Sequence, residues 1–132
     1  MARKVLVVDD DPNMHQVLKH YLEGKGYQTL NASSGKQAIE LATNELPDLI
    51  LLDVGMPDMS GLSALRELKK AETTRLIPVI VITAHADRTT HLESKTSGAA
   101  AFLTKPFRSA ELLDVLQKLL PPDTLPIDSV PV

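Results

Sequence analysis

The sequence predicts an α/β protein built on a doubly wound parallel sheet, and two observations support this. Continuous runs of valine, leucine and isoleucine occupy residues 5–8, 49–52 and 79–82, without the polar alternation of a half-exposed strand. Such runs are typical of strands buried on both faces of a parallel sheet. Strand-like and helix-like segments alternate five times, which indicates βαβ units with right-handed crossovers. The 132 residues suffice for one domain with its own core.

Local signals predict the elements of the first half of the chain, with strands at 5–8, 27–31 and 49–52. Asp11 is expected to cap the first helix and Pro12 to take its first helical position. The buried face of this helix is expected to consist of Met14, Val17, Leu18, Tyr21 and Leu22. Glycines at 24 and 26 end the helix.

The second and third helices are expected on either side of the 49–52 strand. Ser33 or Ser34 can cap the second helix, and Pro47 follows its end. Its buried side is expected to carry Ala38, Ile39, Leu41, Ala42 and Leu46. Ser60 can cap a third helix, whose inward residues are Leu62, Leu65 and Leu68.

The last third of the chain is expected to hold strands at 79–83 and 101–104 and two further helices. The fourth helix, about 87–97, is rich in serine and threonine and has Leu92 as its one large apolar anchor. Ser109 is expected to cap the fifth helix, whose buried face carries Leu112, Leu113, Leu116, Leu119 and Leu120. Residues 121–132 contain four prolines and read as a tail or linker after a domain spanning 1–120.

Composition excludes several classes of function. The 17 acidic and 14 basic residues give a net charge of -3, without the basic excess that nucleic-acid binding needs. The absence of cysteine excludes disulfides and thiolate metal sites. No apolar stretch approaches the roughly 20 residues that span a bilayer, so we expect a cytoplasmic protein without a membrane partner.

Acidic side chains follow two of the buried runs. Asp9 and Asp10 come directly after residues 5–8, and Asp53 follows residues 49–52. The carboxyl ends of parallel strands meet at one edge of the sheet, where ligands bind, so these acids should converge. Carboxylates about 5 Å apart repel by roughly 3 kcal/mol per pair at an effective dielectric of 20. The cluster therefore calls for a cation, whereas the third acid, Asp11, is better explained as a helix cap.

Two more polar groups follow neighbouring strands. Thr83 closes the fourth apolar run, and Lys105 follows the fifth strand. Three carboxylates, a hydroxyl and an ammonium suit Mg²⁺ together with a phosphoryl group. A carboxylate can act as nucleophile toward phosphorus, and lysine and hydroxyl donors can stabilise the oxygens of the transferred group.

Four motifs in fixed order carry a family resemblance: V-L-V-V-D-D-D-P, L-L-D-V-G-M-P-D-M-S-G, I-V-I-T-A and F-L-T-K-P-F. Over roughly residues 3–120 the chain resembles the response-regulator receiver domains of two-component signalling, including the chemotaxis regulators. The resemblance implies a flavodoxin-like fold with five parallel strands in the order 2-1-3-4-5 and five helices. It also implies a signalling switch that catalyses only its own phosphorylation and dephosphorylation.

The resemblance assigns roles to residues of the acid cluster. It implies that Asp53 accepts the phosphoryl group from a histidine kinase or phosphotransfer protein. Asp9 and Asp10 would bind Mg²⁺ together with Asp53, with Asp10 the direct ligand of the acid pair. The backbone carbonyl of Gly55 would supply a further oxygen.

The resemblance also assigns the residues that report phosphorylation. Thr83 corresponds to the switch hydroxyl, Phe102 to the switch aromatic and Lys105 to the phosphate-pairing lysine, and the Lys105–Pro106 peptide is expected to be cis. The surface formed by the fourth helix, fifth strand and fifth helix would then change, and would bind a downstream effector or a second copy.

Three alternatives remain open at this point. A Mg²⁺-dependent phosphohydrolase also forms an aspartyl phosphate, but it would want a second acid two residues after Asp53, where Gly55 stands. A flavin or nucleotide binder would want a glycine-rich loop after the first strand. The third alternative is a receiver that serves only as a docking module.

Some residues receive no chemical role, or one that stays open. The four histidines, His15, His20, His85 and His91, are spread over several elements, suggest no metal site and are expected to be solvated. Gly61 is expected to serve turn geometry. The phosphoryl lifetime stays open, because Gly55 cannot cover the site and His85 could.

Overall fold

The computed structural model describes residues 3–55, 61–84 and 87–120, and these form one five-stranded parallel sheet with five helices. The strand order β2-β1-β3-β4-β5 confirms the predicted topology. In chain order the elements are β1 (Arg3–Val8), α1 (Pro12–Gly24), β2 (Tyr27–Ala32), α2 (Gly35–Glu45), β3 (Leu49–Leu52), α3 (Gly61–Lys70), β4 (Val79–Thr83), α4 (Arg88–Thr96), β5 (Ala101–Thr104) and α5 (Ser109–Leu119).

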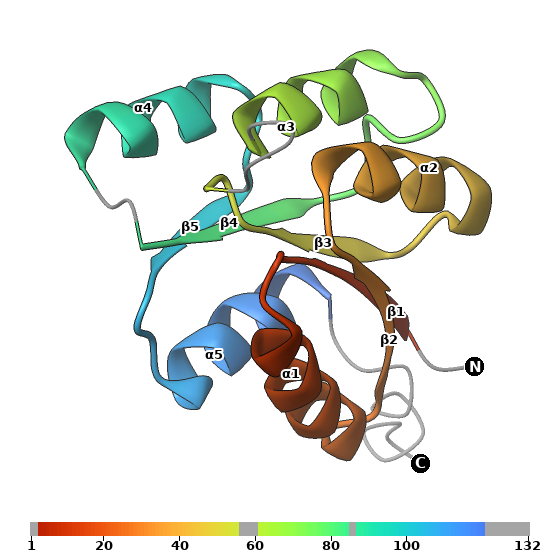
Figure 1. Ribbon diagram of the computed structural model, residues 1–132, viewed down its shortest axis with the longest axis vertical. Helices are drawn as coiled ribbons and strands as arrows, with labels where there is room; N and C mark the ends of the chain where they lie inside the picture. Colours follow the sequence, from red (N-terminus) through yellow and green to blue (C-terminus); the bar gives the residue numbers. More distant parts are fainter. Residues whose placement is uncertain (1–2, 56–60, 85–86, 121–132) are drawn as a thin grey trace, which may run out of the picture.

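Helices cover both faces of the sheet, which explains the unbroken apolar runs. Figure 1 shows α1 and α5 on one face and α2, α3 and α4 on the other. Successive side chains of a strand point to opposite faces. Val5 and Val7 accordingly pack with α1 and α5, whereas Leu6 and Val8 pack with α2 and α3.

Side-chain caps begin three of the helices, at Asp11 and Ser34 as the sequence predicted and also at Asp87. Asp11 accepts a hydrogen bond from the backbone N–H of Asn13 at 2.9 Å, and Ser34 accepts one from Gln37 at 3.1 Å. Asp87 does the same for Thr90 at 3.2 Å. These caps satisfy backbone donors of the first turn that have no partner within the helix.

The prediction for α5 was wrong by one residue. Ser109 is the first helical residue and not the cap, because Arg108 occupies the cap position. The Arg108 backbone N–H donates to the Glu111 carboxylate at 3.1 Å, so the acid in the first turn secures this end of the helix. Ser60, the expected cap of α3, lies outside the described residues, as do 121–132.

Three apolar side chains expected in the core are exposed instead. Val17 is 62% exposed on α1, and Leu92 is 62% exposed on α4 and does not anchor it. Leu46 is 55% exposed, since it ends α2 in the left-handed conformation with φ 47°. The buried side chain of α4 is Ser94, whose hydroxyl donates to the Thr90 carbonyl at 2.8 Å. A helical apolar stripe thus marks the buried face but not its edges.

Gly61 permits a close approach of two backbone segments and does not serve turn geometry, which corrects its predicted role. A Cβ atom at this position would lie 2.3 Å from the Cα of Val54 and 2.4 Å from the carbonyl oxygen of Asp53. Both are backbone atoms, so any larger residue at 61 must displace the chain that follows β3. Gly61 therefore fixes α3 against the segment that carries Asp53.

No helix among the described residues is long and apolar enough to span a bilayer.

Candidate functional site

The acidic residues that follow β1 and β3 converge at the carboxyl edge of the sheet. One carboxylate oxygen from each of Asp9, Asp10 and Asp53 lies within 4.8 Å of the other two. β1 and β3 are adjacent, and Val8 is in register with Leu52, so the residues after both strands emerge side by side. The sheet topology therefore produces the cluster that the sequence predicted.

Lys105 neutralises part of this negative charge. Its Nζ donates to Asp9 Oδ2 at 2.7 Å and to Asp53 Oδ2 at 3.1 Å. Burial disfavours the ammonium, but the hydrogen bonds and the charges of both carboxylates outweigh that penalty and raise the pKa of Lys105 above 10.5. The lysine is thus held charged between two acids of the site.

Backbone hydrogen bonds fix the turn that presents Asp9 and Asp10. Asp9 is 4% exposed, and its backbone N–H continues the sheet by donating to Ala32 at 3.1 Å. Its Oδ1 accepts from the Asp11 backbone N–H at 2.9 Å while its Oδ2 accepts from Lys105. Asp10 is exposed at the mouth of the cluster.

Asp53 is held in a similar way at the end of β3. Its backbone N–H donates to the Val8 carbonyl at 3.0 Å, which continues the pairing of β1 and β3. Its Oδ1 accepts from the Gly55 backbone N–H at 2.8 Å, and its Oδ2 accepts from Lys105. The carboxylate is therefore fixed in orientation, with its side chain 12% exposed.

The donor set of the cluster fits a hard divalent cation. All three side chains offer carboxylate oxygens close enough to share one ion. Mg²⁺ takes one or two protein carboxylates, keeps several waters and accepts phosphate oxygens. The single ammonium of Lys105 leaves net negative charge among the three acids, which such a cation would offset.

The two predicted switch residues lie on neighbouring strands. Thr83 ends β4 and is fully buried, and its carbonyl accepts from the Lys105 backbone N–H at 2.9 Å. Phe102 pairs in register with Val81, so Phe102 and Thr83 point to the same face of the sheet, the one covered by α4. The Lys105–Pro106 peptide is cis, as expected.

Two histidines contribute contacts that the sequence analysis missed. His15 is 8% exposed instead of solvated, and its Nε2 lies 2.7 Å from the Asp9 carbonyl oxygen. Its i, i+3, i+7 spacing with Leu18 and Leu22 was the available signal. His91 stacks on Phe102 with ring centroids 4.5 Å apart and planes 11° apart. His85 lies outside the described residues.

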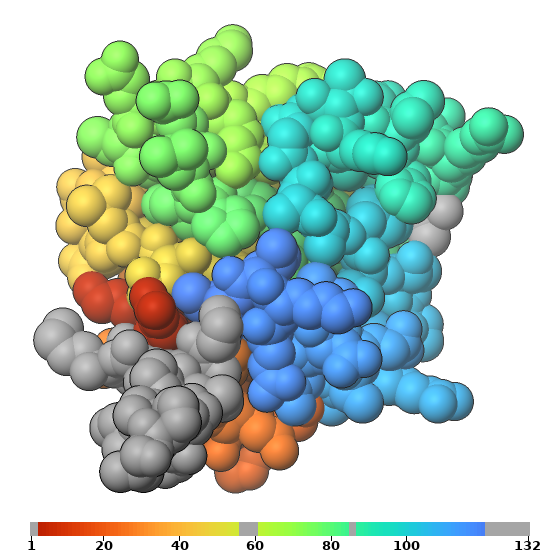
Figure 2. All heavy atoms as spheres, turned by 180° about the vertical axis from the view of Figure 1, so that it is seen from behind, coloured from red at the N-terminus to blue at the C-terminus, as the bar shows by residue number. Residues whose placement is uncertain are grey.

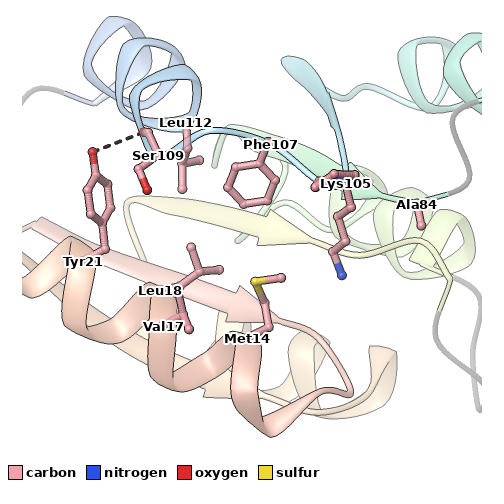
Figure 3. Close-up of a pocket in the computed structure, with 10 residues that line it drawn as sticks. Met14, Val17, Leu18, Tyr21, Ala84, Lys105, Phe107, Ser109 and Leu112 are labelled. Carbon is pink, nitrogen blue, oxygen red and sulfur yellow. Dashed lines mark hydrogen bonds between the residues drawn. The ribbon is translucent and has the colours of Figure 1, made fainter.

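An apolar hollow adjoins the acid cluster between α1 and α5. The cavity has a volume of about 400 Å³, and Figure 3 shows Met14, Val17 and Leu18 of α1 facing Phe107 and Leu112. The side chain of Lys105 also lines it, so the hollow borders the site.

Comparison with known proteins identifies the family. The family model described as response regulator receiver domain matches residues 5–117. The sporulation initiation phosphotransferase F of Bacillus subtilis is 38% identical over 121 residues, which are 92% of this chain and 96% of that protein. Protein PilH of Pseudomonas aeruginosa is 39% identical over 91% of this chain and 98% of its own length.

Solved structures agree with this assignment. The chemotaxis protein CheY4 of Vibrio cholerae matches with a TM-score of 0.85 at 32% identity, over 91% of this chain and all of that one. The receiver domain of the Pseudomonas aeruginosa sensor histidine kinase PA1611, solved with a magnesium ion in its active site cleft, matches with a TM-score of 0.83 at 33% identity, over 90% and 98% of the two chains. The chain therefore belongs to the response regulator receiver domains, the phosphorylation-activated signalling modules of two-component systems.

Proposed function

We propose that Asp53 accepts a phosphoryl group from a phosphorylated histidine of a kinase or phosphotransfer protein. In this proposal Mg²⁺ is held by Asp9, Asp10, Asp53 and the backbone carbonyl of Gly55. The observation that carries it is the bridge of Lys105 between Asp9 and Asp53, beside an all-carboxylate cluster. A lysine held between two acids can move to the oxygens of an incoming phosphoryl group without leaving the site.

The chemistry follows from the positions of these groups. A carboxylate oxygen of Asp53 attacks the phosphorus while the bond from phosphorus to the donor's histidine nitrogen breaks. Mg²⁺ held by Asp9, Asp10 and Asp53 would supply positive charge to the oxygens of the transferred group. Lys105 donates to the same oxygens, and the Gly55 N–H holds the nucleophile in orientation.

The switch would pass from this site through β4 to β5. Thr83 and Lys105 draw toward the new phosphoryl oxygens, and Phe102 turns inward on the same face of the sheet as Thr83. That turn must break the stacking of Phe102 on His91. Because His91 is on α4, the surface of α4, β5 and α5 changes. Figure 2 shows α4 and α5 exposed on one side of the molecule, where an effector or a second copy could bind.

This switch is a shift between two populations, since phosphorylation can favour the second state only by interacting more strongly with it. Lys105 interacts differently in the two states, because it contacts carboxylates before phosphorylation and phosphoryl oxygens afterwards.

The apolar hollow beside Lys105 is the surface that a phosphodonor protein would cover when its histidine reaches Asp53. Val17 is an apolar residue of its lining and is 62% exposed. An apolar side chain of the donor would gain burial there without competing with the core.

Val17→Asn is expected to slow phosphotransfer from a histidine kinase by about tenfold, as for the loss of a contact worth 1.4 kcal/mol. Phosphorylation by acetyl phosphate should be unchanged, because that donor needs no protein contact. The matched control is Leu76→Asn, since Leu76 is 81% exposed and precedes β4 at the opposite edge of the sheet. Equal rates for both variants with the kinase would refute docking at this hollow.

The proposed function is tested by adding beryllofluoride, a phosphoryl mimic, with Mg²⁺ and recording amide chemical shifts by NMR. We expect Mg²⁺-dependent shifts around Asp53, Thr83 and Lys105 that spread to Phe102 and His91. Asp53→Asn should remove the response to beryllofluoride. A wild-type spectrum that does not change would contradict the proposal.

A further inference from the structure

We propose that His15 is a positioning residue, which holds the turn after β1 in the conformation that binds Mg²⁺. The proposal rests on the proposed function, because it gives His15 a role toward that metal site. His15 touches no phosphoryl group and supplies no ligand. It acts through the backbone of the acidic residues.

His15 binds the backbone on both sides of Asp10. Its ring Nε2 lies 2.7 Å from the carbonyl oxygen of Asp9, and its backbone N–H donates to the carbonyl oxygen of Asp11 at 3.3 Å. A carbonyl oxygen only accepts hydrogen bonds, so Nε2 must carry the proton. The imidazole therefore holds the peptide group of Asp9, whereas the bond to Asp11 is the first i→i−4 bond of α1, which any non-proline residue at this position would make.

The second ring nitrogen of His15 makes no hydrogen bond to the part of the chain that the structure describes, so the contact of Nε2 with Asp9 is the polar interaction that the imidazole contributes. The Nδ1 atom is buried and has no hydrogen-bond partner within the described residues. Leaving a polar atom in this state is unfavourable. The other two buried positions of α1 are Leu18 and Leu22, which avoid that cost. At position 15, the hydrogen bond from Nε2 to Asp9 offsets the cost of burying the unpaired Nδ1 atom.

The held backbone matters because the three carboxylates repel one another. Asp10 is exposed, and no strand pairing restrains it. If the peptide between Asp9 and Asp10 could rotate, repulsion would favour conformations with Asp10 turned away from Asp53. Mg²⁺ binding would then have to reorder the turn. The hydrogen bond from His15 orders the turn before Mg²⁺ binds, so binding does not have to order it. Residues that hydrogen-bond to metal ligands act in the same way in other sites.

The test compares two replacements of His15 in the full chain. His15→Leu removes the donor and should weaken Mg²⁺ binding about tenfold, the low end of the 10–100-fold cost of losing an outer-shell partner. His15→Gln places an amide N–H near the position of Nε2 and should restore affinity to within about threefold of the wild type. Affinity is measured from the amide shift of Gly55 during titration with MgCl₂.

The control is His20→Leu, which makes the same change at an exposed position of the same helix and should leave the affinity unchanged. Metal-free protein gives a second measurement, because the imidazole ¹⁵N shifts of His15 report which nitrogen carries the proton. We expect the Nε2–H tautomer. Thermal unfolding shows whether each variant is folded.

Three results would overturn the proposal. The first is a His15→Leu variant that binds Mg²⁺ as tightly as His20→Leu. The second is equal impairment of the leucine and glutamine variants when both are folded. The third is an Nδ1–H tautomer in the wild type, because Nε2 could then not donate to the Asp9 carbonyl oxygen. This result would overturn the proposal even if the leucine variant fails to fold. A wild type that binds no Mg²⁺ would overturn the proposed function as well, so the two failures are distinguishable.

Discussion

Lys105→Met is expected to lower the free energy of unfolding by about 3 kcal/mol in metal-free protein, since removing one partner of a buried ion pair costs about that much. The ammonium lies 2.7 Å from Asp9 and 3.1 Å from Asp53, whose side chains are 5% and 12% exposed. Without it, three neighbouring carboxylates have no cation among them. Urea unfolding of both proteins in the presence of a chelator measures the difference.

The pH dependence of this effect follows from the raised pKa of Lys105. A base whose pKa is raised by folding stabilises the protein fully below its unfolded value, here 10.5, and that contribution disappears as the pH rises through the folded value. The difference between wild type and Lys105→Met should therefore be constant at about pH 7–10 and shrink above that range. Lys118→Met, at an exposed position of α5, is the matched control. Equal stabilities of the two variants would contradict the assigned role of Lys105.

Asp10→Asn is expected to change stability and metal binding in opposite directions. Without Mg²⁺ the variant should be more stable, by about 1 kcal/mol after allowing for solvent screening of an exposed acid, because one repelling charge is gone. Its affinity for Mg²⁺ should fall by more than about 100-fold, since even outer-shell partners contribute 10–100-fold. Unfolding curves recorded with and without MgCl₂ measure both effects.

Asp11→Asn is the matched control, because asparagine can also cap α1 and Asp11 is not one of the three clustered acids. It should leave the Mg²⁺ affinity within about threefold of the wild type, as expected for a charge outside the metal site. If Asp10→Asn destabilises the metal-free protein, the carboxylates are not in net repulsion and the need for a cation is unsupported.

The fold and the clustered acids could be predicted because they depend on patterns that the sequence displays directly. Apolar runs without alternation indicated strands buried on both faces, and parallel topology brings the residues after Val8 and Leu52 to one edge. The caps at Asp11 and Ser34 depend on local chemistry alone. Each of these predictions uses only the residue pattern within one strand or helix, or the general rule that parallel strands end at the same edge of a sheet.

The remaining details depend on three-dimensional packing. Val17 fits the apolar stripe of α1 yet is exposed, and Leu92, the one large apolar residue of α4, is exposed as well. His15 was expected in solvent because histidine is a polar residue, although its spacing to Leu18 and Leu22 places it on the buried face of α1. Gly61 showed its role only once α3 was placed against the backbone of Asp53 and Val54. The stacking of His91 on Phe102 joins a helix and a strand, so no local rule could predict it.

The most direct test of the account is to locate the phosphoryl group in the chain. The protein is incubated with acetyl phosphate and MgCl₂, reduced with borohydride to trap any acyl phosphate, and analysed by peptide mass spectrometry. We predict a single modified residue, Asp53, and no modification when Mg²⁺ is chelated. Modification of Asp9 or Asp10 in place of Asp53, or none in the presence of Mg²⁺, would contradict the account.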